Sequence, residues 1–302
     1  MERETDAVVP ETVWRVVSHY GIEVLLRSPK GIERRAPVDR QASLVVGDEV
    51  VWPSTGLQRR PRTRALQRRD RRGRIRTVAS NLTAMGVVVA PRPRTPDAFI
   101  DRAIVGARAV DIEPFFVVNK SDLGEGNALV DHLLSHWPGV EPVLSVSATT
   151  GQGLDALQGW LAGGARAVFV GVSGVGKSSL MNALVEDLAL TVGEINPQTE
   201  LGRHVTTNAT LHRLAEGGEL IDTPGFRDFG PVAISAGDLA AYFPGFEAAL
   251  SERCRYRDCR HRTEPQCAVL QAVTEGRIGS ERHAAYMALQ DELTQVDRAR
   301  RR

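Results

Sequence analysis

Cysteine is scarce in this chain, which contains three among 302 residues. An odd number argues against the disulfide framework of a secreted domain, in which cysteines come in pairs. The N-terminal stretch is acidic and contains no apolar core, so it does not resemble a secretory signal. From these absences we expect the protein to be cytoplasmic.

The chain also lacks long apolar runs and has almost no net charge. No run approaches the roughly 20 apolar residues that a helix needs to cross a bilayer, so we expect no membrane segment. The formal net charge of +1 gives no overall field that attracts nucleic acid, and we expect no DNA partner. The hydrophobic content of 42% and the charged content of 25% are typical of a soluble globular protein, here long enough for two or three domains.

One segment departs from this charge balance. Between Arg59 and Arg76, ten arginines stand against one acid, Asp70. The arginines are Arg59, Arg60, Arg62, Arg64, Arg68, Arg69, Arg71, Arg72, Arg74 and Arg76. Because this basic segment has no apolar period, we predict a loop or linker, and because guanidinium groups match phosphate geometry, we expect it to contact RNA. The alternative is a merely solvated loop.

The N-terminal part contains short β-branched and apolar runs, separated by turn signals at Gly21 and Gly47. The expected strands are residues 12–17, 22–27, 43–46 and 49–52. They predict a small β-barrel or sandwich, with an OB-type barrel as one solution, and the pattern does not choose between these. We expect Trp14 and Trp52 in the core of this part rather than on its surface as platforms for bases.

From about residue 82, buried strands alternate with helices, which indicates a doubly wound α/β sheet. The expected strands are residues 86–90, 115–118, 143–146 and 167–171, and the expected helices are residues 99–108, 127–137 and 153–161. Further along, the strand signals fade and helical segments such as residues 282–296 follow. We therefore divide the chain into an N-terminal barrel with its basic linker (1–80), an α/β domain (81–231) and a C-terminal domain (232–302).

A glycine-rich phosphate loop stands between an apolar run and a helical segment. It comprises Gly171, Val172, Ser173, Gly174, Val175, Gly176, Lys177 and Ser178, and is followed by Ser179. In this strand–loop–helix context, backbone N–H groups and the helix N-terminus bind phosphates. Lys177 would reach the β- and γ-phosphates, and the Ser178 hydroxyl would bind Mg²⁺. The alternative is a glycine-rich turn that occurs by chance.

A guanine-reading loop follows another apolar run. It contains Asn119, Lys120, Ser121 and Asp122. The carboxylate of Asp122 can accept hydrogen bonds from both N1–H and N2–H₂ of guanine, whereas adenine offers no matching pair of donors. After the next strand, Ser147 and Ala148 resemble the backbone segment that supports guanine O6 in GTPases. Each signal is weak alone, but together with the phosphate loop they predict a GTP site.

The segment from Asp222 to Gly225 follows a short apolar strand. In GTPases an aspartate at this place holds Mg²⁺ through water, and the glycine N–H meets the γ-phosphate; the alternative is a plain Pro-Gly turn. A threonine within residues 202–207 would complete the Mg²⁺ shell and order its loop when the γ-phosphate is present. Phe226 stands where Ras-type sites have a water-positioning Gln, so we expect slow intrinsic turnover and another positioning group, such as His204 or a partner.

All three cysteines and one histidine gather in a short stretch near the C-terminus. This cysteine cluster consists of Cys254, Cys259, His261 and Cys267. Three thiolates and an imidazole make a closed four-coordinate zinc site with no open position for water, so we expect a structural role. The metal would supply folding energy to a segment with few large apolar residues. The alternatives are buried free thiols, or one disulfide with a spare thiol.

The guanine-reading loop precedes the phosphate loop, which reverses the order of most GTPases. With this order, the string at residues 171–180, the segments 202–207 and 222–225, and the cysteine cluster, the chain resembles the RsgA (YjeQ) family of circularly permuted GTPases over essentially its whole length. The resemblance implies an OB-fold domain, a permuted P-loop GTPase domain and a small, mainly helical zinc-binding domain. It also implies action late in small ribosomal subunit maturation, with GTP hydrolysed on that subunit.

The resemblance assigns roles to further residues. The family's His-Thr-Thr-Thr reads His204, Val205, Thr206 and Thr207 here. It places the Mg²⁺-linked threonine at Thr206, with Thr207 as the fallback, and aligns His204 with a histidine implicated in hydrolysis. We therefore expect Lys177, His204 and Thr206 to be catalytic. The implied ligands are GTP or GDP, Mg²⁺ and one structural Zn²⁺, and the implied partners of a monomer are the small ribosomal subunit and its rRNA.

Two other functions stay open. The protein could be a GTP-gated RNA-binding checkpoint in which hydrolysis only times release, or a GTPase that serves another structured RNA, such as a tRNA-modification factor.

The motif order adds a hypothesis about how the state of the nucleotide is transmitted to the C-terminal domain. Because the segment after Asp222 leads soon into Cys254, the γ-phosphate would set the pose of the C-terminal domain, while the barrel is anchored from the opposite end.

Overall fold

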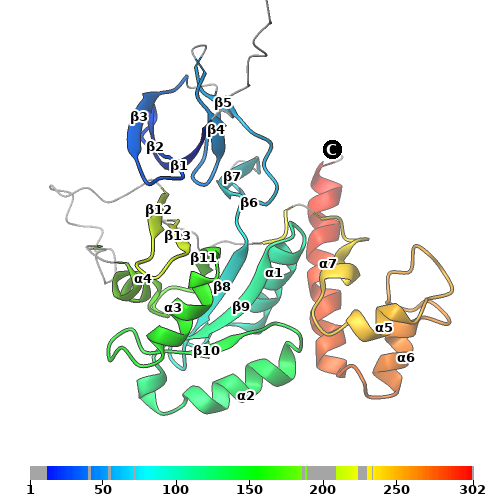
Figure 1. The fold of residues 1–302 in the computed structure, drawn as a ribbon. Helices are drawn as coiled ribbons and strands as arrows, with labels where there is room; N and C mark the ends of the chain where they lie inside the picture. Colours follow the sequence, from blue (N-terminus) through cyan, green and yellow to red (C-terminus); the bar gives the residue numbers. More distant parts are fainter. Residues whose placement is uncertain are drawn as a thin grey trace, which may run out of the picture.

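The structure is a computed structural model that describes residues 12–39, 42–53, 56–70, 73–185, 188, 209–223, 230–232 and 234–300. Figure 1 shows three parts: a small N-terminal barrel, a central sheet flanked by helices, and a helical C-terminal part beside it. The strands are β1 (Val13–His19), β2 (Glu23–Arg27), β3 (Glu33–Pro37), β4 (Glu49–Val51), β5 (Gln58–Arg59), β6 (Ala65–Arg69), β7 (Ile75–Ser80), β8 (Ala84–Val89), β9 (Glu113–Val118), β10 (Val143–Ser145), β11 (Arg166–Val170), β12 (Thr210–Arg213) and β13 (Glu219–Asp222). The helices are α1 (Asp97–Arg108), α2 (Gly126–His136), α3 (Leu154–Ala162), α4 (Lys177–Leu184), α5 (Glu247–Ser251), α6 (Ala268–Thr274) and α7 (Ser280–Arg300), with 3₁₀ turns η1 (Ser121–Leu123) and η2 (Leu239–Tyr242).

The central sheet has the strand order β10-β9-β8-β11-β13-β12, in which β12 is antiparallel to β13 and the other pairs are parallel. Every residue of β8 is buried, as expected for an interior parallel strand. Helices α1 and α2 cover one face through residues such as Ile104 and Leu133, and α3 and α4 cover the other through Leu157 and Leu180. Helices on both faces confirm the predicted doubly wound fold, which binds ligands at the carboxyl ends of its strands.

The N-terminal strands curve around a small apolar core of their own, which gives the predicted OB-type barrel. That core includes Val16, Val24, Leu26 and Val50, which are fully buried. The expected strand at residues 43–46 is wrong, because this stretch forms only an isolated bridge at Val46.

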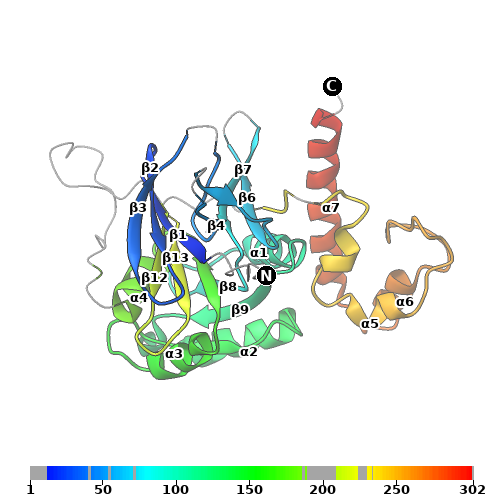
Figure 2. The ribbon, with the colours of Figure 1, turned by 45° about the horizontal axis from the view of Figure 1, so that its top comes forward.

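The barrel is joined to the central sheet by strand pairing. β1 pairs with β2 and β4 inside the barrel, and also with β12, where Ser18 lies opposite Thr210. The sheet therefore continues as β12-β1-β2-β3 and contains eleven strands. Figure 2 shows β1 beside β12 and β13. Neither β12 nor this pairing was expected from the sequence.

The prediction that the basic segment is a loop or linker is wrong for residues 65–69 and 75–76, which lie in strands, whereas residues 60–64 connect strands. The segment contributes to β5, β6 and β7, and β6 pairs with β7 in a hairpin. Each strand of the hairpin contributes little apolar surface, chiefly Leu66 and Ala79, so no period is visible in the sequence. Part of the charge is used within the chain: Arg62 Nε donates to the buried carboxylate of Asp48 at 2.7 Å. Arginines can therefore build this structure as well as bind a partner.

The two tryptophans of the barrel lie near its surface. Their rings meet edge to face, with centroids 6.3 Å apart. Trp14 is half-buried and packs against the barrel core, whereas Trp52 is 36% exposed. The expectation of a core position is wrong for Trp52, which follows the last residue of β4 and is exposed.

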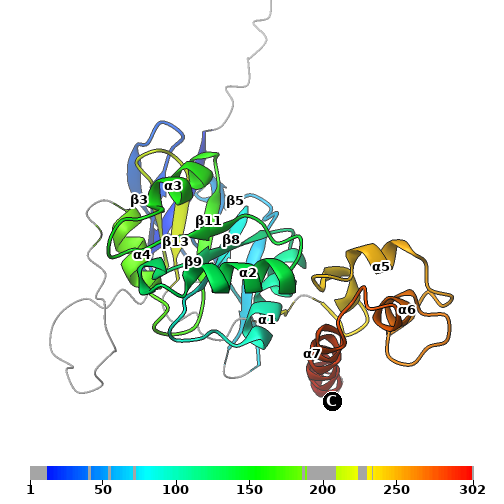
Figure 3. The same cartoon turned by 90° about the horizontal axis from the view of Figure 1, so that it is seen from below.

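The C-terminal part contains η2, α5, α6 and α7, and it contacts α1 of the central domain (Figure 3). Arg282 of α7 forms an ion pair with the buried carboxylate of Asp101 at 2.7 Å. Trp137 Nε1 donates to the same carboxylate, and the Arg282 guanidinium lies 4.3 Å from the Phe243 ring centroid. Within the described residues, no helix is long and apolar enough to cross a membrane.

Candidate functional site

The phosphate loop begins where β11 ends and closes at the first residue of α4. Gly174 and Gly176 have φ angles of 84° and 92°, which favour glycine over residues with a side chain. A Cβ at Gly176 would collide with the side-chain amide of Asn119, and one at Gly171 would collide with the Val88 carbonyl. These glycines are therefore required by the close approach of neighbouring chain segments as well as by backbone conformation.

Lys177 lies at the start of α4, where the N–H groups of a helix point toward an anion. Its Nζ donates to the carbonyls of Gly171 at 2.7 Å and Val172 at 2.9 Å. The loop thus curls around its own lysine and fixes the ammonium beside the backbone that would bind phosphate. Val175 is fully buried and anchors the loop in the core, whereas Ser173 is exposed. Ser178 and Ser179 follow Lys177 in the first turn of α4.

Asn119 links three parts of the site. Its Nδ2 donates to the Val175 carbonyl of the phosphate loop at 2.9 Å, and its Oδ1 accepts from the Ala148 N–H at 3.1 Å. The side chain is 1% exposed, so these protein contacts replace water. We expected Asn119 to be part of the nucleotide site, and its amide joins the loops of that site. A guanine O6 would have to share the Ala148 N–H with Asn119.

Lys120 also contacts the phosphate loop. Its Nζ donates to the Gly174 carbonyl at 2.7 Å and to the Arg92 carbonyl at 2.9 Å. The backbone of Lys120 is left-handed, with φ of 62°, which turns the side chain away from the preceding strand. Arg92 was not expected at this site from the sequence. Its position after β8, the strand beside β11, could have indicated it, because ligand loops follow neighbouring parallel strands.

Asp122 lies in η1, where its side chain is exposed. The backbone of this turn is fixed by the neighbouring loop, because the Ser121 N–H donates to the Val146 carbonyl at 3.0 Å. Ser147 is fully buried, and its Oγ accepts from the Thr150 N–H at 3.2 Å. These contacts fix the backbone and leave the Asp122 carboxylate at the surface, where it can meet a base.

Asp222 is the last residue of β13, which runs parallel to β11. Burial raises the pKa of this carboxyl group, since the charged form loses solvation. A nearby divalent cation would reverse that effect, so the chemistry of the site fits Mg²⁺. The other predicted switch residues, His204, Thr206, Thr207, Gly225 and Phe226, lie outside the described residues.

The described motifs meet at one edge of the sheet in spite of their order in the chain. The guanine-reading loop follows β9, Ser147 and Ala148 follow β10, the phosphate loop follows β11, and Asp222 ends β13. All four strands are parallel, so their carboxyl ends coincide. The arrangement can bind a phosphorylated ligand between the loops, with the carboxylate of Asp122 at one end and that of Asp222 at the other.

The cysteine cluster has the dimensions of a tetrahedral metal site. Its four ligand atoms lie within 4.8 Å of one another. His261 Nδ1 lies 3.3 Å from Cys267 Sγ and 3.7 Å from Cys254 Sγ, and the two sulfurs are 4.0 Å apart. Ligands at ordinary Zn–S and Zn–N lengths in a tetrahedron are about 3.5 to 3.8 Å apart, so these residues fit zinc. The three thiols are free, which excludes a disulfide in this structure.

Burial favours the neutral forms of two ligands of the cluster. Burial and the neighbouring thiol of Cys267 raise the pKa of Cys259 to about 12, and burial lowers the pKa of His261. A metal ion would stabilise the thiolates that this crowding disfavours. The N–H groups of Ala268 and Leu270, at the start of α6, point at the sulfurs of Cys254 and Cys267 at 3.4 and 3.5 Å. Such contacts orient metal ligands.

Comparison with known proteins gives a family match. The family model described as RsgA GTPase matches residues 59–231. The small ribosomal subunit biogenesis GTPase RsgA of Pseudomonas aeruginosa is 39% identical, with 98% of this chain and 90% of the relative covered. The crystal structure of YjeQ from Thermotoga maritima has a TM-score of 0.73 at 29% identity and covers 94% of this chain and 99% of its own. YloQ, a circularly permuted GTPase, has a TM-score of 0.69 at 21% identity, covering 97% and 98%, and supports the fold.

Proposed function

The chain belongs to the RsgA family of GTPases, and from this premise we propose that it binds the small ribosomal subunit and hydrolyses GTP there during late maturation. One observation carries the nucleotide part of the proposal: the guanine-reading loop, the phosphate loop and Asp222 lie at the carboxyl ends of neighbouring parallel strands. The subunit as partner is supported by the name of the P. aeruginosa relative.

In the proposed site, Asp122 binds the base while Asn119 and Lys120 keep the guanine-reading loop in register with the phosphate loop. Lys177, the loop N–H groups and the N-terminus of α4 stabilise the charge on the transferred phosphoryl group. Ser178, Asp222 and Thr206 would hold Mg²⁺, which when bound neutralises charge on the phosphate oxygens. We assign the positioning of the attacking water to His204.

The remaining assignments complete the proposal. The cysteine cluster would hold one structural Zn²⁺, and the chain divides into a barrel with its basic segment (1–80), a GTPase domain (81–231) and a zinc-binding domain (232–302). The protein acts as a cytoplasmic monomer.

We propose the β6–β7 hairpin as the surface that binds rRNA. In this hairpin Arg68 lies directly opposite Arg76, and both are exposed. Asp70 balances part of this charge, since its carboxylate pairs with Arg74 and Arg76, and exposed guanidinium groups beside it match phosphate geometry.

Co-sedimentation with purified small ribosomal subunits tests the partner. We expect the protein to pellet with the small subunit in the presence of a non-hydrolysable GTP analogue, and less with GDP, because residues 202–207 and 222–225 would contact the γ-phosphate that GDP lacks. Large subunits and bulk tRNA serve as controls. Preferential binding to tRNA would favour a GTPase for another RNA. If the analogue locks the protein on the subunit while assembly otherwise proceeds, the checkpoint function is favoured.

The base specificity is tested by Asp122→Asn. Replacing the carboxylate by an amide removes the charge and puts an NH₂ donor opposite one of the guanine N–H donors, so we expect GTP affinity to fall about 10- to 100-fold. Affinity for the xanthosine nucleotide should rise, because its ring carries an oxygen that the new amide can meet. Competition binding with both nucleotides measures the shift. Asp131→Asn, at an exposed carboxylate of α2, is the matched control, and an unchanged GTP preference in Asp122→Asn would refute this role.

A further inference from the structure

The pairing of β1 with β12 places a residue of the barrel in line with the nucleotide site. Asp222 of β13 lies opposite Thr210 of β12, and Thr210 lies opposite Ser18 of β1. Side chains also link β1 to β12 at this position. Ser18 Oγ is hydrogen-bonded to Thr210 Oγ1 at 3.1 Å and donates to the Ala209 carbonyl at 3.4 Å. Ser18 is 2% exposed, so water does not compete for these contacts.

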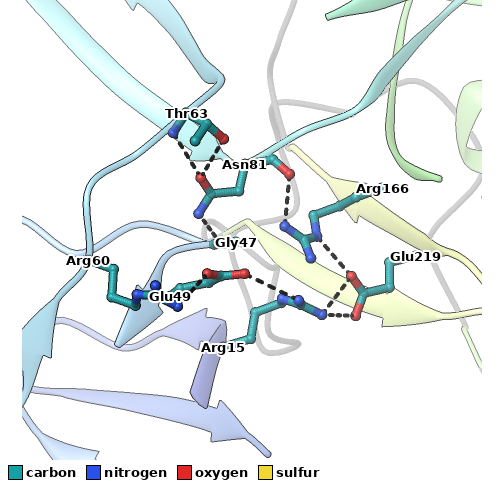
Figure 4. Close-up of polar contacts among 8 residues, drawn as sticks. All are labelled: Arg15, Gly47, Glu49, Arg60, Thr63, Asn81, Arg166 and Glu219. Carbon is teal, nitrogen blue, oxygen red and sulfur yellow. Dashed lines mark hydrogen bonds and ion pairs between the residues drawn. The ribbon is translucent and has the colours of Figure 1, made fainter. Parts of the chain in front are cut away.

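The other end of β13 is also held by the barrel (Figure 4). Arg15 Nη1 donates to both carboxylate oxygens of Glu219, at 2.9 and 3.1 Å, and Arg15 Nη2 lies 3.5 Å from Glu49 Oε1 of β4. Burial favours the neutral acid, but the hydrogen bonds and charges of Arg166 and Arg15 outweigh it and hold the pKa of Glu219 below its usual value. The carboxylate therefore stays charged between two guanidinium groups.

Arg166 extends the same network to the strand that leads into the phosphate loop. It is the first residue of β11, and its Nε donates to Glu219 at 2.8 Å. Its Nη1 donates to the Asn81 carbonyl at 2.8 Å, while Asn81 Nδ2 donates to the Gly47 carbonyl in the barrel at 3.0 Å. Figure 4 shows these residues gathered between the two domains. The barrel is thus fastened to β13 and β11, two of the strands that end at the nucleotide site.

We propose that Ser18 and Arg15 are positioning residues for the GTPase site, which act through Thr210 and Glu219 to hold the strand that presents Asp222. The inference rests on the proposed role of Asp222 in binding Mg²⁺. Both ends of β13 are attached to β1, so a shift of the barrel moves that carboxylate relative to the phosphate loop. A cleft of about 400 Å³ lies beside Arg15 and Arg166, where β1 of the barrel meets the start of β11 and β13.

This coupling works in both directions. If Mg²⁺ and the nucleotide favour one position of β13, they favour the matching position of the barrel. By thermodynamic linkage, a partner that binds the barrel in that position raises the affinity for Mg²⁺ and nucleotide by the same factor. The N-terminal barrel is then a regulatory part of the site, in addition to any contact that it makes with RNA.

The test compares the Mg²⁺ dependence of nucleotide binding in the wild type, Arg15→Ala, Ser18→Ala and the double variant. We expect the Mg²⁺ concentration that gives half-maximal binding of a GTP analogue to rise at least about fivefold in the double variant. Nucleotide affinity in excess EDTA should not change, because the phosphate and guanine-reading loops are intact; a merely structural role would lower both. Arg15→Lys should recover part of the loss by restoring the charge beside Glu219.

Arg35→Ala is the matched control, because Arg35 pairs with Glu23 inside the barrel. A wild type that binds no GTP would overturn the proposed function and the inference with it. Folded variants with the Mg²⁺ dependence of the wild type would overturn the inference alone. If the variants do not fold, hydrogen exchange of the wild type decides: adding Mg²⁺ to the nucleotide complex should slow exchange in β1 and leave β3 unchanged, and unchanged exchange in β1 refutes the coupling.

Discussion

Replacing Lys177 with alanine should lower kcat for GTP hydrolysis by about 100- to 1,000-fold, the loss expected when one donor to transition-state charge is removed. The structure gives the reason: two carbonyls of the phosphate loop hold the ammonium at the start of α4, the end of a helix that favours anions. Truncation removes that charge, and the loop N–H groups remain. Single-turnover hydrolysis with saturating GTP measures the chemical step directly.

The control is Lys30→Ala, the same substitution at an exposed turn of the barrel. Both variants should unfold at nearly the temperature of the wild type, because neither side chain is part of the core. We expect turnover of Lys30→Ala to match the wild type. Normal hydrolysis by a folded Lys177→Ala variant would mean that the phosphates bind elsewhere.

Removing zinc should unfold the C-terminal part of the chain. Zinc binding to small sites of this kind is worth about 10 to 16 kcal/mol, as much as or more than the stability of a typical domain. Cys267 is 3% exposed and close to both Cys254 and His261, so Cys267→Ser should abolish metal binding as well as the fold around it. Atomic spectroscopy for one zinc per chain, followed by circular dichroism with and without a chelator, measures both effects.

A matched variant separates the metal from general damage. Tyr256→Ser changes an exposed residue two positions from Cys254 and should keep the zinc. Limited proteolysis should cut the chelated wild type and Cys267→Ser within residues 232–302 while sparing Tyr256→Ser. A metal-free wild type that resists protease there and keeps its helical signal would contradict the proposed site.

The sequence predicted the nucleotide loops because their chemistry is local. Gly171 to Ser178 lies between a buried strand and a helix, and the guanine-reading loop follows another buried strand, so short patterns were sufficient to place both. The cysteine cluster was equally visible, since its four ligands lie close in the chain. What these motifs share is that each forms within one strand–loop–helix unit or one short segment.

The missed features depend on partners far away in the sequence. Arg62 is paired with Asp48, and Arg64 with Asp111, so the basic segment folds as strands by contacts that its own composition does not reveal. β12 has four residues, of which Leu211 is buried, too little to be recognised as a strand. The contacts of the Asn119 amide were also not visible, because they reach loops that follow other strands of the sheet.

The structure adds a second route to the hypothesis that the γ-phosphate sets the pose of the C-terminal domain. That domain docks on α1 through Arg282 and Asp101, on the face of the sheet away from α4. The barrel, by contrast, shares a sheet with β13 itself. Motif order in the chain indicated the C-terminal exit, but strand pairing gives the N-terminal domain the shorter mechanical path to Asp222.

The pairing of β1 with β12 also sets an order of events at the ribosome that makes this protein. Ser18 and Thr210 are separated by 192 positions, so at about 5 to 20 residues per second the nascent barrel waits about 10 to 40 s for its partner strand. During that interval the edge of β1 around Ser18 presents open hydrogen-bonding groups, which invite pairing with other chains. Synthesis of β12 therefore both completes this side of the GTPase domain and pairs the open edge of β1.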